Sequence, residues 1–542
     1  MRKIGLLILF CTVVCSVWGI PARRGGIVKT QPDGTQITVY QHGDEHFRWI
    51  TNEKGEWLEV DKNGFYQVTE ALSAEEIRVK QMAAPSRIAQ AQKAATPLNI
   101  APRGLVILVN FADVKFETNK AELDSMLTGK NYSRDYSYMY GGRKYFVTSN
   151  GSAWQYFYES SNGQYSPQFD VVGPVTVSKN MDYYGKNVSD FDAAPWDMVK
   201  EACELVNDSV DFSLYDNDKD GYVDFVYVVY AGYGEADGGA ANTIWPHSYW
   251  LFESGVTCKV DGKYVDLYAC GNELDYYTKH HTGIGTFCHE FSHVLGLPDL
   301  YTTEGQTHKT LGSWDILDYG PYNNDMNTPP AYSAYERFMM GWLTPRLIVE
   351  AEDVELEELQ ESNSALLISS TDQHNLIGND PKPTTFYLLE NRQQVGWDEY
   401  LPGHGLMLTK IVYNQRSWSE NIVNNSSNRM GVDLIEADGK TPSSSKDGYT
   451  GKASDLFPAG ATEYLGIKDH SIEEVSENNG VISFKYKGGR INTATSEVVL
   501  NNDIIAIYDV LGQKMTTKKI EALSEGTYIV KTTQGTKKII IR

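Results

Sequence analysis

One short segment, HEFSHVLGLPD, places residue types that bind metal ions or transfer protons at fixed spacings. His289 and His293 are four residues apart, so on a helix both imidazoles lie on one face and reach a single metal ion. Glu290 follows the first histidine and is placed to reach a water molecule on that metal. This arrangement is typical of zinc hydrolases, in which the metal acidifies the water and a glutamate accepts its proton. The segment therefore predicts a catalytic zinc centre.

A third ligand would complete this centre and leave one position open for water. Gly296 tolerates a positive φ angle, so the chain can leave the helix sharply, and Pro298 stops the helix from resuming. Asp299 is thereby directed back toward the metal and is the predicted third ligand. A later glutamate, Glu304 or Glu336, is the alternative, because some zinc enzymes take this ligand from a later helix.

A second group of carboxylates follows the pattern of a calcium-binding loop. Asp216, Asp218, Asp220 and Asp224 occupy the first, third, fifth and ninth positions of an EF-hand-type loop, with glycine at the sixth. The twelfth position is a tyrosine instead of glutamate, and a strand follows the loop. We predict a structural calcium site that also uses the carbonyl oxygen of Tyr222. An Asx-rich turn without metal is the alternative.

The elements that must position these residues belong to an α/β domain, predicted over residues 103–350. Apolar runs predict buried strands, and apolar periodicity with helix-ending residues predicts helices. The predicted strands are 104–111 and 224–234, and the predicted helices are 195–207, 285–297 and 333–343. From residue 351 to 488, short alternating segments predict an all-β accessory domain. Residues 489–542 begin with a linker and continue as a compact strand series.

Composition limits the classes of partner. The chain of 542 residues has 48 basic and 71 acidic residues and a net charge of −23, so no nucleic-acid partner is expected. Residues 1–19 read as a secretory signal peptide, with a short basic start and an apolar run too short to span a bilayer. No other stretch is apolar enough to cross a membrane, so no transmembrane segment is expected after signal cleavage.

Residues 20–102 have the two-part character of a prosegment. Residues 20–70 alternate polar and apolar side chains between turns and predict a small β-rich unit, whereas 71–102 are rich in alanine and glutamine and predict a cleavable linker. No cysteine lies in this region, so a thiolate cannot block the zinc. Steric cover or a carboxylate must do so, and Asp33, Asp44 and Asp61 are candidates, although all three suit ordinary turns.

Other histidines and cysteines carry weaker signals. Three histidines within the predicted α/β domain have no ligand spacing of their own, and structural roles are favoured for His247, His280 and His281. Four cysteines follow the signal peptide, namely Cys203, Cys258, Cys270 and Cys288. Cys258 and Cys270 bracket a predicted hairpin and could form a disulfide in an exported chain, and four buried thiols are the alternative.

The segment HEFSHVLGLPDLY resembles the zinc helix of the immune inhibitor A family of secreted bacterial metallopeptidases. Further blocks are similar in the same order, namely DNDKDGYVDFVYVVYAGYGEADGG, IWPHSYW, LGSWDILDYG and TPPAYSAYERFMMGWLTP. FYLLENRQQVGWDEYLPGHGLML resembles the β-region that follows the peptidase domain in that family. The resemblance covers roughly residues 100–480. It implies a zinc endopeptidase of metzincin-like fold that hydrolyses protein or peptide substrates.

One position departs from the metzincin pattern. Leu317 stands where those peptidases place a methionine beneath the zinc, and such volume-conserving swaps usually cost less than about 1.5 kcal/mol. An active site with a hydrophobic floor is therefore expected. Tyr319, two residues on, is a catalytic candidate, because a tyrosine there contacts the zinc or the oxyanion in some metzincins. A packed aromatic is its alternative role. Glu290 is expected to act as general base and then as general acid.

The last fifty residues resemble the sorting domains of the type IX secretion system, through IYDVLGQKM, GTYIVK and the basic end KKIIIR. The resemblance implies transit through the periplasm with this machinery as a partner, followed by release or attachment to the outer cell surface. Two other functions stay open. One is a surface adhesion protein with an inactive peptidase domain, and the other is a zinc amidase that acts on cell-wall peptides. The intact residues of the metal motif favour the endopeptidase.

Overall fold

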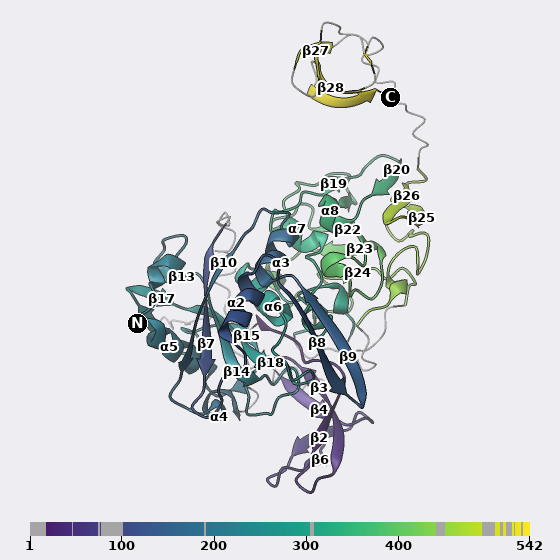
Figure 1. Cartoon of the computed structure of the whole chain (residues 1–542). Helices are drawn as coiled ribbons and strands as arrows, with labels where there is room; N and C mark the ends of the chain where they lie inside the picture. Colours follow the sequence, from purple (N-terminus) through teal and green to yellow (C-terminus); the bar gives the residue numbers. More distant parts are fainter. Residues whose placement is uncertain are drawn as a thin grey trace, which may run out of the picture.

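The computed structural model describes the chain except for several segments. The described residues are 18–45, 47–73, 76, 101–188, 191–303, 308–440, 450–489, 504–509, 513–515, 523–524, 526–532 and 535–541. The predicted signal peptide up to residue 17 and the predicted linker 77–100 lie outside them. The fold is mixed α/β, as predicted, and Figure 1 shows a central sheet flanked by helices.

The central sheet has six strands in the order β1-β15-β18-β14-β7-β10. Four neighbours run parallel, whereas β15 is antiparallel to β18 and β1 is antiparallel to β15. The strands are β1 (Trp18–Gly19), β7 (Arg103–Asn110), β10 (Gln168–Thr176), β14 (Val226–Tyr233), β15 (His247–Trp250) and β18 (Leu267–Leu274). The predicted strands at 104–111 and 224–234 are confirmed as β7 and β14.

Strand β7 is buried on both faces because successive side chains enter different cores. Leu105 and Ile107 pack with α5, and Val106 and Leu108 pack with the helices of the opposite face. The helices are α2 (Lys120–Thr128), α3 (Ala153–Ser160), α4 (Met181–Gly185), α5 (Pro195–Val206), α6 (Gly285–Val294) and α7 (Ala334–Met339). Helix α7 is shorter than its predicted range, 333–343, because the chain turns at Gly341 with a φ of 71°.

Several further strands of this domain lie outside the central sheet. The hairpin of β8 (Ser133–Tyr140) and β9 (Arg143–Asn150) extends toward the N-terminal strands (Figure 1). The remaining short strands are β11 (Asn187–Val188), β12 (Phe191–Asp192), β13 (Tyr222–Val223), β16 (Cys258–Val260) and β17 (Lys263–Val265).

The N-terminal β-rich unit is a five-stranded antiparallel meander. Its strands are β2 (Gly26–Thr30), β3 (Gln36–Gly43), β4 (Arg48–Thr51), β5 (Trp57–Val60) and β6 (Tyr66–Val68). Its small core of Ile27, Val39 and Leu58 packs against Tyr276 and Tyr277 of the α/β domain. The unit is therefore docked on the domain by side-chain packing.

The region after residue 344 is dominated by β-structure. One sheet has the order β19-β21-β22-β23-β24, and another has the order β20-β26-β25. The strands are β19 (Arg346–Leu347), β20 (Glu352–Leu356), β21 (Leu366–Ser369), β22 (Thr385–Arg392), β23 (Gly405–Val412), β24 (Val432–Leu434), β25 (Ile472–Asn478) and β26 (Val481–Tyr486). Two short helices, α8 (Leu359–Ser362) and α9 (Gln415–Ser419), accompany them. Leu388, Met407 and Trp418 join the same core cluster as Phe291 of α6, so the two regions pack as one body.

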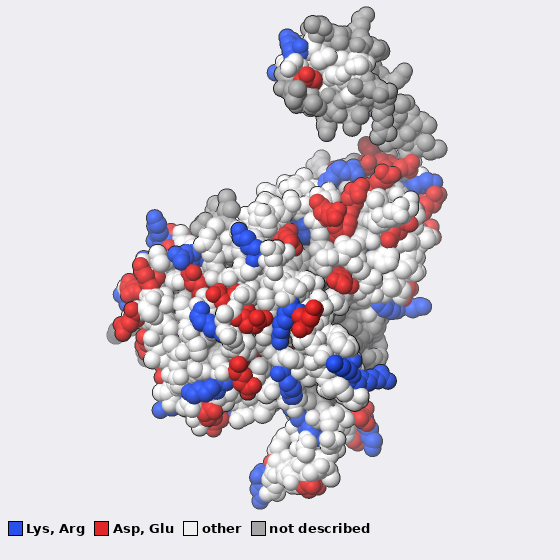
Figure 2. All heavy atoms as spheres, in the orientation of Figure 1, with Lys and Arg blue, Asp and Glu red and all other residues white. Residues whose placement is uncertain are grey.

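The C-terminal residues include a three-stranded antiparallel sheet, drawn in yellow in Figure 1. Its strands are β27 (Ile504–Asp509), β28 (Gly526–Thr532) and β29 (Gly535–Ile541). On the face shown in Figure 2, acidic side chains gather near β20 and β26, and basic side chains are scattered among acidic ones. Within the described part of the chain, no helix is long and apolar enough to cross a bilayer.

Candidate metal centre

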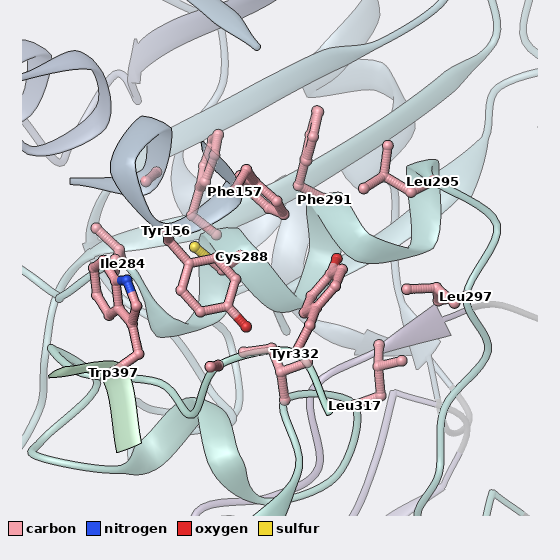
Figure 3. Close-up of a cluster of buried hydrophobic side chains, with 14 of the residues drawn as sticks. Tyr156, Phe157, Ile284, Cys288, Phe291, Leu295, Leu297, Leu317, Tyr332 and Trp397 are labelled. Atoms are coloured by element: carbon pink, nitrogen blue, oxygen red, sulfur yellow. The ribbon is translucent and has the colours of Figure 1, made fainter. Parts of the chain in front are cut away.

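Helix α6 carries the paired histidines and is anchored by its other face. Phe287 and Phe291 are buried, and the ring of Phe291 lies 4.9 Å from the rings of Phe157 and Phe225. Figure 3 shows this aromatic packing around the helix. His289 and His293, on the opposite side, are also buried, with 0% and 2% of their surface exposed. The predicted helix 285–297 is confirmed, but its regular part ends at Val294.

The turn after the helix brings a carboxylate back to the histidines. Gly296 has a φ of 90°, the left-handed conformation that its predicted role requires. Asp299 Oδ1 lies 3.3 Å from Nε2 of His289 and 3.3 Å from Nε2 of His293, and the two Nε2 atoms are 3.1 Å apart. Three potential ligand atoms therefore converge in one buried place, within 4.8 Å of one another.

Backbone carbonyls fix the orientation of both imidazoles. His289 Nδ1 donates to the carbonyl of Ile316 at 2.7 Å, and His293 Nδ1 donates to that of Leu297 at 2.8 Å. A proton on Nδ1 leaves the Nε2 lone pair for a metal. Leu317, the expected hydrophobic floor, is fully buried, and Figure 3 shows it beside Leu297.

Asn421, which follows α9, holds the aspartate in place. Its side-chain amide donates to Asp299 Oδ2 at 2.6 Å and accepts from the Asp299 backbone N–H at 2.7 Å. The other carboxylate oxygen, Oδ1, is the one that faces the histidines. Burial alone would raise the pKa of Asp299, but the two imidazoles lower it below its ordinary value. The carboxylate is thus kept ionised, as a metal ligand must be.

Glu290 is fully buried beside this group. Its Oε1 accepts the backbone N–H of Ile20 at 3.1 Å. Burial raises the pKa of Glu290, and the Asp299 carboxylate raises it further, whereas the Ile20 N–H opposes this shift. A carboxyl group with a raised pKa is suited to accept and return a proton near neutral pH.

Comparison with known proteins identifies the domain that holds this centre. Residues 98–343 match the family model of the immune inhibitor A peptidase M6 catalytic domain. This part of the chain is similar to peptidase M6 catalytic domains. Immune inhibitor A of Bacillus thuringiensis subsp. alesti is 28% identical over 262 residues, which cover 42% of this chain and 38% of the relative.

A second relative is the pre-pro-metalloprotease PrtV of Vibrio cholerae serotype O1. It is 26% identical over 291 residues, which cover 47% of this chain and 31% of the relative. The match thus spans only about a third of the length of each relative. The peptidase M6 match contains both histidines, Glu290 and Asp299, but it ends before Asn421.

The structure describes one of the two alternative third ligands. Glu336 is buried at the start of α7, where its Oε2 accepts the backbone N–H of Ser333 in a capping box. It is therefore committed to the helix end and does not join the histidine group. Glu304 lies outside the described residues.

The N-terminal residues pass directly through this site. Strand β1 extends the sheet at the edge formed by β15, and the hydroxyl of Tyr301 donates to the carbonyl of Gly19. Trp245 donates its indole N–H to the Ile20 carbonyl at 2.9 Å. The hydroxyl of Tyr319 accepts the backbone N–H of Arg24 at 2.8 Å. Tyr319 thus contacts the N-terminal segment here, and its predicted catalytic role stays a prediction.

The predicted calcium loop is only partly assembled. Carboxylate oxygens of Asp216, Asp218 and Asp220 gather within 4.8 Å of one another. Asp224 does not join them, because its Oδ2 accepts the backbone and side-chain N–H groups of Asn217 at 2.6 and 2.8 Å. Lys263 Nζ lies 2.6 Å from Asp216 Oδ2, so an ammonium group already offsets part of the negative charge. No described contact tests the predicted Tyr222 carbonyl ligand.

The remaining histidines have structural contacts. His247 is buried in β15, with Nδ1 2.7 Å from the Trp245 carbonyl, and burial lowers its pKa. His280 packs against the Tyr136 ring. Burial is the largest cause that lowers the pKa of His281 to about 4, followed by the charge of Arg134.

The four cysteines that follow the predicted signal peptide are buried free thiols. Cys258 lies in β16 and Cys270 in β18, and these strands belong to different sheets. Cys270 Sγ is 3.5 Å from His247 Nδ1, whereas Cys258 interacts with Cys203. The proposed pair is therefore separated, and the alternative of buried thiols describes this structure.

The clamp on Asp299 can be tested through metal affinity. Asn421 has a φ of 53°, so Asn421→Gly removes the amide without forcing a side chain into a left-handed conformation. We expect zinc affinity to fall about 10- to 100-fold, as for other residues that orient a ligand. Competition with a chromogenic chelator measures it, and exposed Asn428 provides the control Asn428→Gly. Equal affinity in both variants would show that Asp299 needs no clamp.

Proposed function

We propose that this protein is a secreted zinc-dependent endopeptidase that cleaves protein or peptide substrates. The observation that carries the proposal is the convergence of His289, His293 and Asp299 beside buried Glu290, inside a peptidase M6 domain. The relatives are named as immune inhibitor A and as a metalloprotease, which supports the same reaction. A metzincin-like arrangement of the domain is part of the proposal.

The residues of this centre fit a zinc ion. Two imidazoles and one carboxylate are a donor set that catalytic zinc uses, and Asp299 Oδ1 is buried without a hydrogen-bond partner. When bound, zinc would supply a Lewis acid that polarises a carbonyl and acidifies water. Glu290 would accept the proton of that water and hold it on a buried carboxyl group. It would then return the proton to the departing amine.

The N-terminal segment indicates where a substrate would lie. The Ile20 N–H contacts Glu290, and the Gly19 carbonyl accepts from Tyr301, so one peptide bond has both of its polar groups at the site. In a substrate, the same contact would place the amide nitrogen where Glu290 can protonate it. Tyr301 would donate to the carbonyl oxygen of that bond, a role for which the sequence offers Tyr319 as a candidate.

The same segment makes the chain a zymogen in this proposal. Residues 20–24, which remain after removal of the predicted signal peptide, contact Glu290, Trp245 and Tyr319. The following meander packs on the domain, so removal of the region up to the 84–102 linker would open the site. Asp33 and Asp61 are bonded within exposed turns, to Thr35 and to backbone groups such as that of Asn63. They are thus poor candidates for a zinc-blocking carboxylate.

Asp44, the third candidate, and its neighbour Glu45 lie closer to the centre. Asp44 is buried, and its Oδ1 accepts the Phe47 N–H at 3.1 Å. Glu45 is also buried, and its pKa is raised by burial and then by the charges of Asp44, Asp299 and Glu290. No signal in the sequence separates Glu45 from the other glutamates of the chain.

The metal dependence of the reaction tests the proposed function. Matured enzyme is expected to cleave casein, to lose this activity with a strong zinc chelator, and to regain it with a slight excess of zinc. Muropeptides run in parallel should stay intact if the enzyme is an endopeptidase rather than a cell-wall amidase. Activity that persists without metal would reject the proposal, and inactivity toward every substrate would favour a binding protein.

Calcium binding at Asp216, Asp218 and Asp220 is a separate part of the proposal. Crowded carboxylates repel unless a cation lies among them, so calcium should stabilise the loop. We expect EGTA, at constant zinc, to lower the melting temperature by a few degrees. Asp218→Ala should abolish that shift, because it removes one of the three converging oxygens, one that contacts no ammonium group among the described residues. An unchanged melting temperature on EGTA addition would leave the loop as a metal-free turn.

Export through the type IX system stays a proposal that rests on the sequence. The described strands of residues 504–541 form a small sheet, as the strand pattern predicted, but this does not distinguish a sorting domain from other small β-units. Whether a chain that ends at residue 489 still leaves the periplasm is the direct test.

A further inference from the structure

Arg23 of the N-terminal segment is held in a buried acidic pocket beside the metal centre. Its Nη1 lies 2.7 Å from Asp275 Oδ2, and its Nη2 lies 2.6 Å from Asp325 Oδ1. The guanidinium also lies over the Tyr277 ring, 4.1 Å from the ring centre. Only 8% of the Arg23 surface is exposed. The pocket thus contacts both terminal nitrogens and one face of the guanidinium group.

The pocket is built by the peptidase domain itself. Asp275 Oδ1 accepts the backbone N–H groups of Tyr277 and Thr278, at 2.6 and 3.0 Å, which leaves Oδ2 for the guanidinium. Asp325 Oδ2 accepts the Tyr138 hydroxyl at 2.8 Å, which leaves Oδ1. Both carboxylates are therefore oriented by contacts that do not involve Arg23, and the pocket should persist after the segment departs.

The path of the segment is that of an extended peptide bound at the site. Strand β1 pairs antiparallel with β15, the backbone N–H of Ile20 donates to Glu290, and the backbone N–H of Arg23 donates to the Ala236 carbonyl at 2.8 Å. A substrate that follows the same path would place its side chains in the same pockets. Arg23 is the third residue after Ile20, whose amide meets the catalytic glutamate.

We propose that Asp275, Asp325 and Tyr277 form a specificity subsite that binds an arginine side chain of the substrate, three residues after the residue whose amide nitrogen is released. This inference rests on the proposed endopeptidase function. A planar guanidinium can bridge two separate carboxylates and stack on an aromatic ring, whereas the compact ammonium of lysine makes fewer of these contacts. Arginine should therefore be preferred over lysine.

Further carboxylates near the pocket also favour a bound cation. Asp237 is buried nearby, and burial followed by the charge of Asp275 raises its pKa to about 7, against the opposing effect of Arg23. When the N-terminal segment departs, it removes both Arg23 and Lys29, whose ammonium group bonds to the Gly238 carbonyl. The cleft is then left with several carboxylates and loses two of the cations that faced them.

Matched peptides on the matured enzyme test the subsite. The peptides differ at one position only, the third after the residue that supplies the released amine. This position holds Arg, Lys, Gln or Glu. We expect kcat/KM to be about tenfold or more higher for Arg than for Gln, and lower still for Glu, as for a charged group that loses its buried partner. In Asp275→Asn and Asp325→Asn, the ratio of Arg to Gln should approach one. The exposed control Asp208→Asn should keep the wild-type ratio.

The outcomes separate this inference from the proposed function. If casein is cleaved but the four peptides are cleaved equally well, the subsite is wrong and the endopeptidase stands. If neither casein nor any peptide is cleaved, the proposed function is wrong and the subsite falls with it. Asn keeps the shape of Asp, and a melting curve checks each variant. If Asp275→Asn does not fold, Asp325→Asn decides the matter, because the Asp325 side chain is 22% exposed.

Discussion

Glu290→Ala is expected to abolish measurable cleavage of casein while the protein keeps its zinc. A positioned general acid–base typically contributes about 10²- to 10⁴-fold to the rate, and Glu290 is the carboxylate that lies against the Ile20 amide. None of the three predicted ligands is altered, so metal stoichiometry should stay that of the wild type. Activity on casein and zinc content by atomic absorption measure the two effects separately.

Two variants control this experiment. Glu290→Gln keeps the size of the side chain and should be as inactive as Glu290→Ala, which would exclude a packing effect. Glu204, an exposed residue of α5, supplies the control Glu204→Ala, which should retain full activity. Cleavage that survives in Glu290→Gln would mean that another group accepts the proton.

The local parts of the site follow from sequence spacing. The histidines are four positions apart on one helix, and one glycine with a positive φ turns the chain, so a short stretch of sequence is enough to direct Asp299 back toward them. The buried strands β7 and β14 are predictable for a similar reason, because a short continuous apolar run is typical of a strand that is covered on both faces of a sheet. Such features depend on neighbours in the chain, and those neighbours are visible in a sequence.

The supporting contacts depend on residues far apart in the chain, and no local pattern signals them. Asn421 reaches Asp299 across 122 positions, and Ile20 reaches Glu290 across 270. In the calcium loop, the spacing matched the expected pattern but the predicted ligand set did not form. Asn217 donates a hydrogen bond to Asp224, and Lys263 of another strand contacts Asp216. Spacing fixes which oxygens could meet, whereas tertiary packing decides which of them do.

When Arg48 is replaced by alanine, the uncleaved chain, which is a zymogen in our proposal, is expected to show peptidase activity. Arg48, in β4 of the N-terminal meander, lies 2.7 Å from Asp192 and 2.8 Å from Glu235 of the peptidase domain, and all three side chains are at least nine-tenths buried. Removal of one partner from such a group usually costs about 3–5 kcal/mol, because charge is left buried without compensation. That cost would fall on the docked state, and the meander should release the cleft more often.

The test compares full-length chains that have not been cut. In the Glu290→Ala background, which prevents self-cleavage, Arg48→Ala should make the N-terminal region more sensitive to added trypsin. With Glu290 intact, the same variant should show casein activity before any cleavage product is seen. Lys54→Ala, at an exposed turn of the same meander, should stay as latent and as resistant as the wild type.

The pH dependence of this leak identifies its cause. Burial, opposed by Arg48 and reinforced by Asp192, raises the pKa of Glu235 to about 7. Without Arg48 the pKa of Glu235 should rise further, so at pH 6 the carboxyl group can stay buried in its neutral form at small cost. At pH 8 the docked state must either bury the charge or hold the proton against solution, and docking weakens as the pH rises through the raised pKa. The excess activity of Arg48→Ala over wild type, corrected for the intrinsic pH profile of the matured enzyme, should therefore be larger at pH 8 than at pH 6. An excess that is equal at both values would attribute the leak to lost packing against Trp245, whose ring lies 5.0 Å from the guanidinium, rather than to the buried charges.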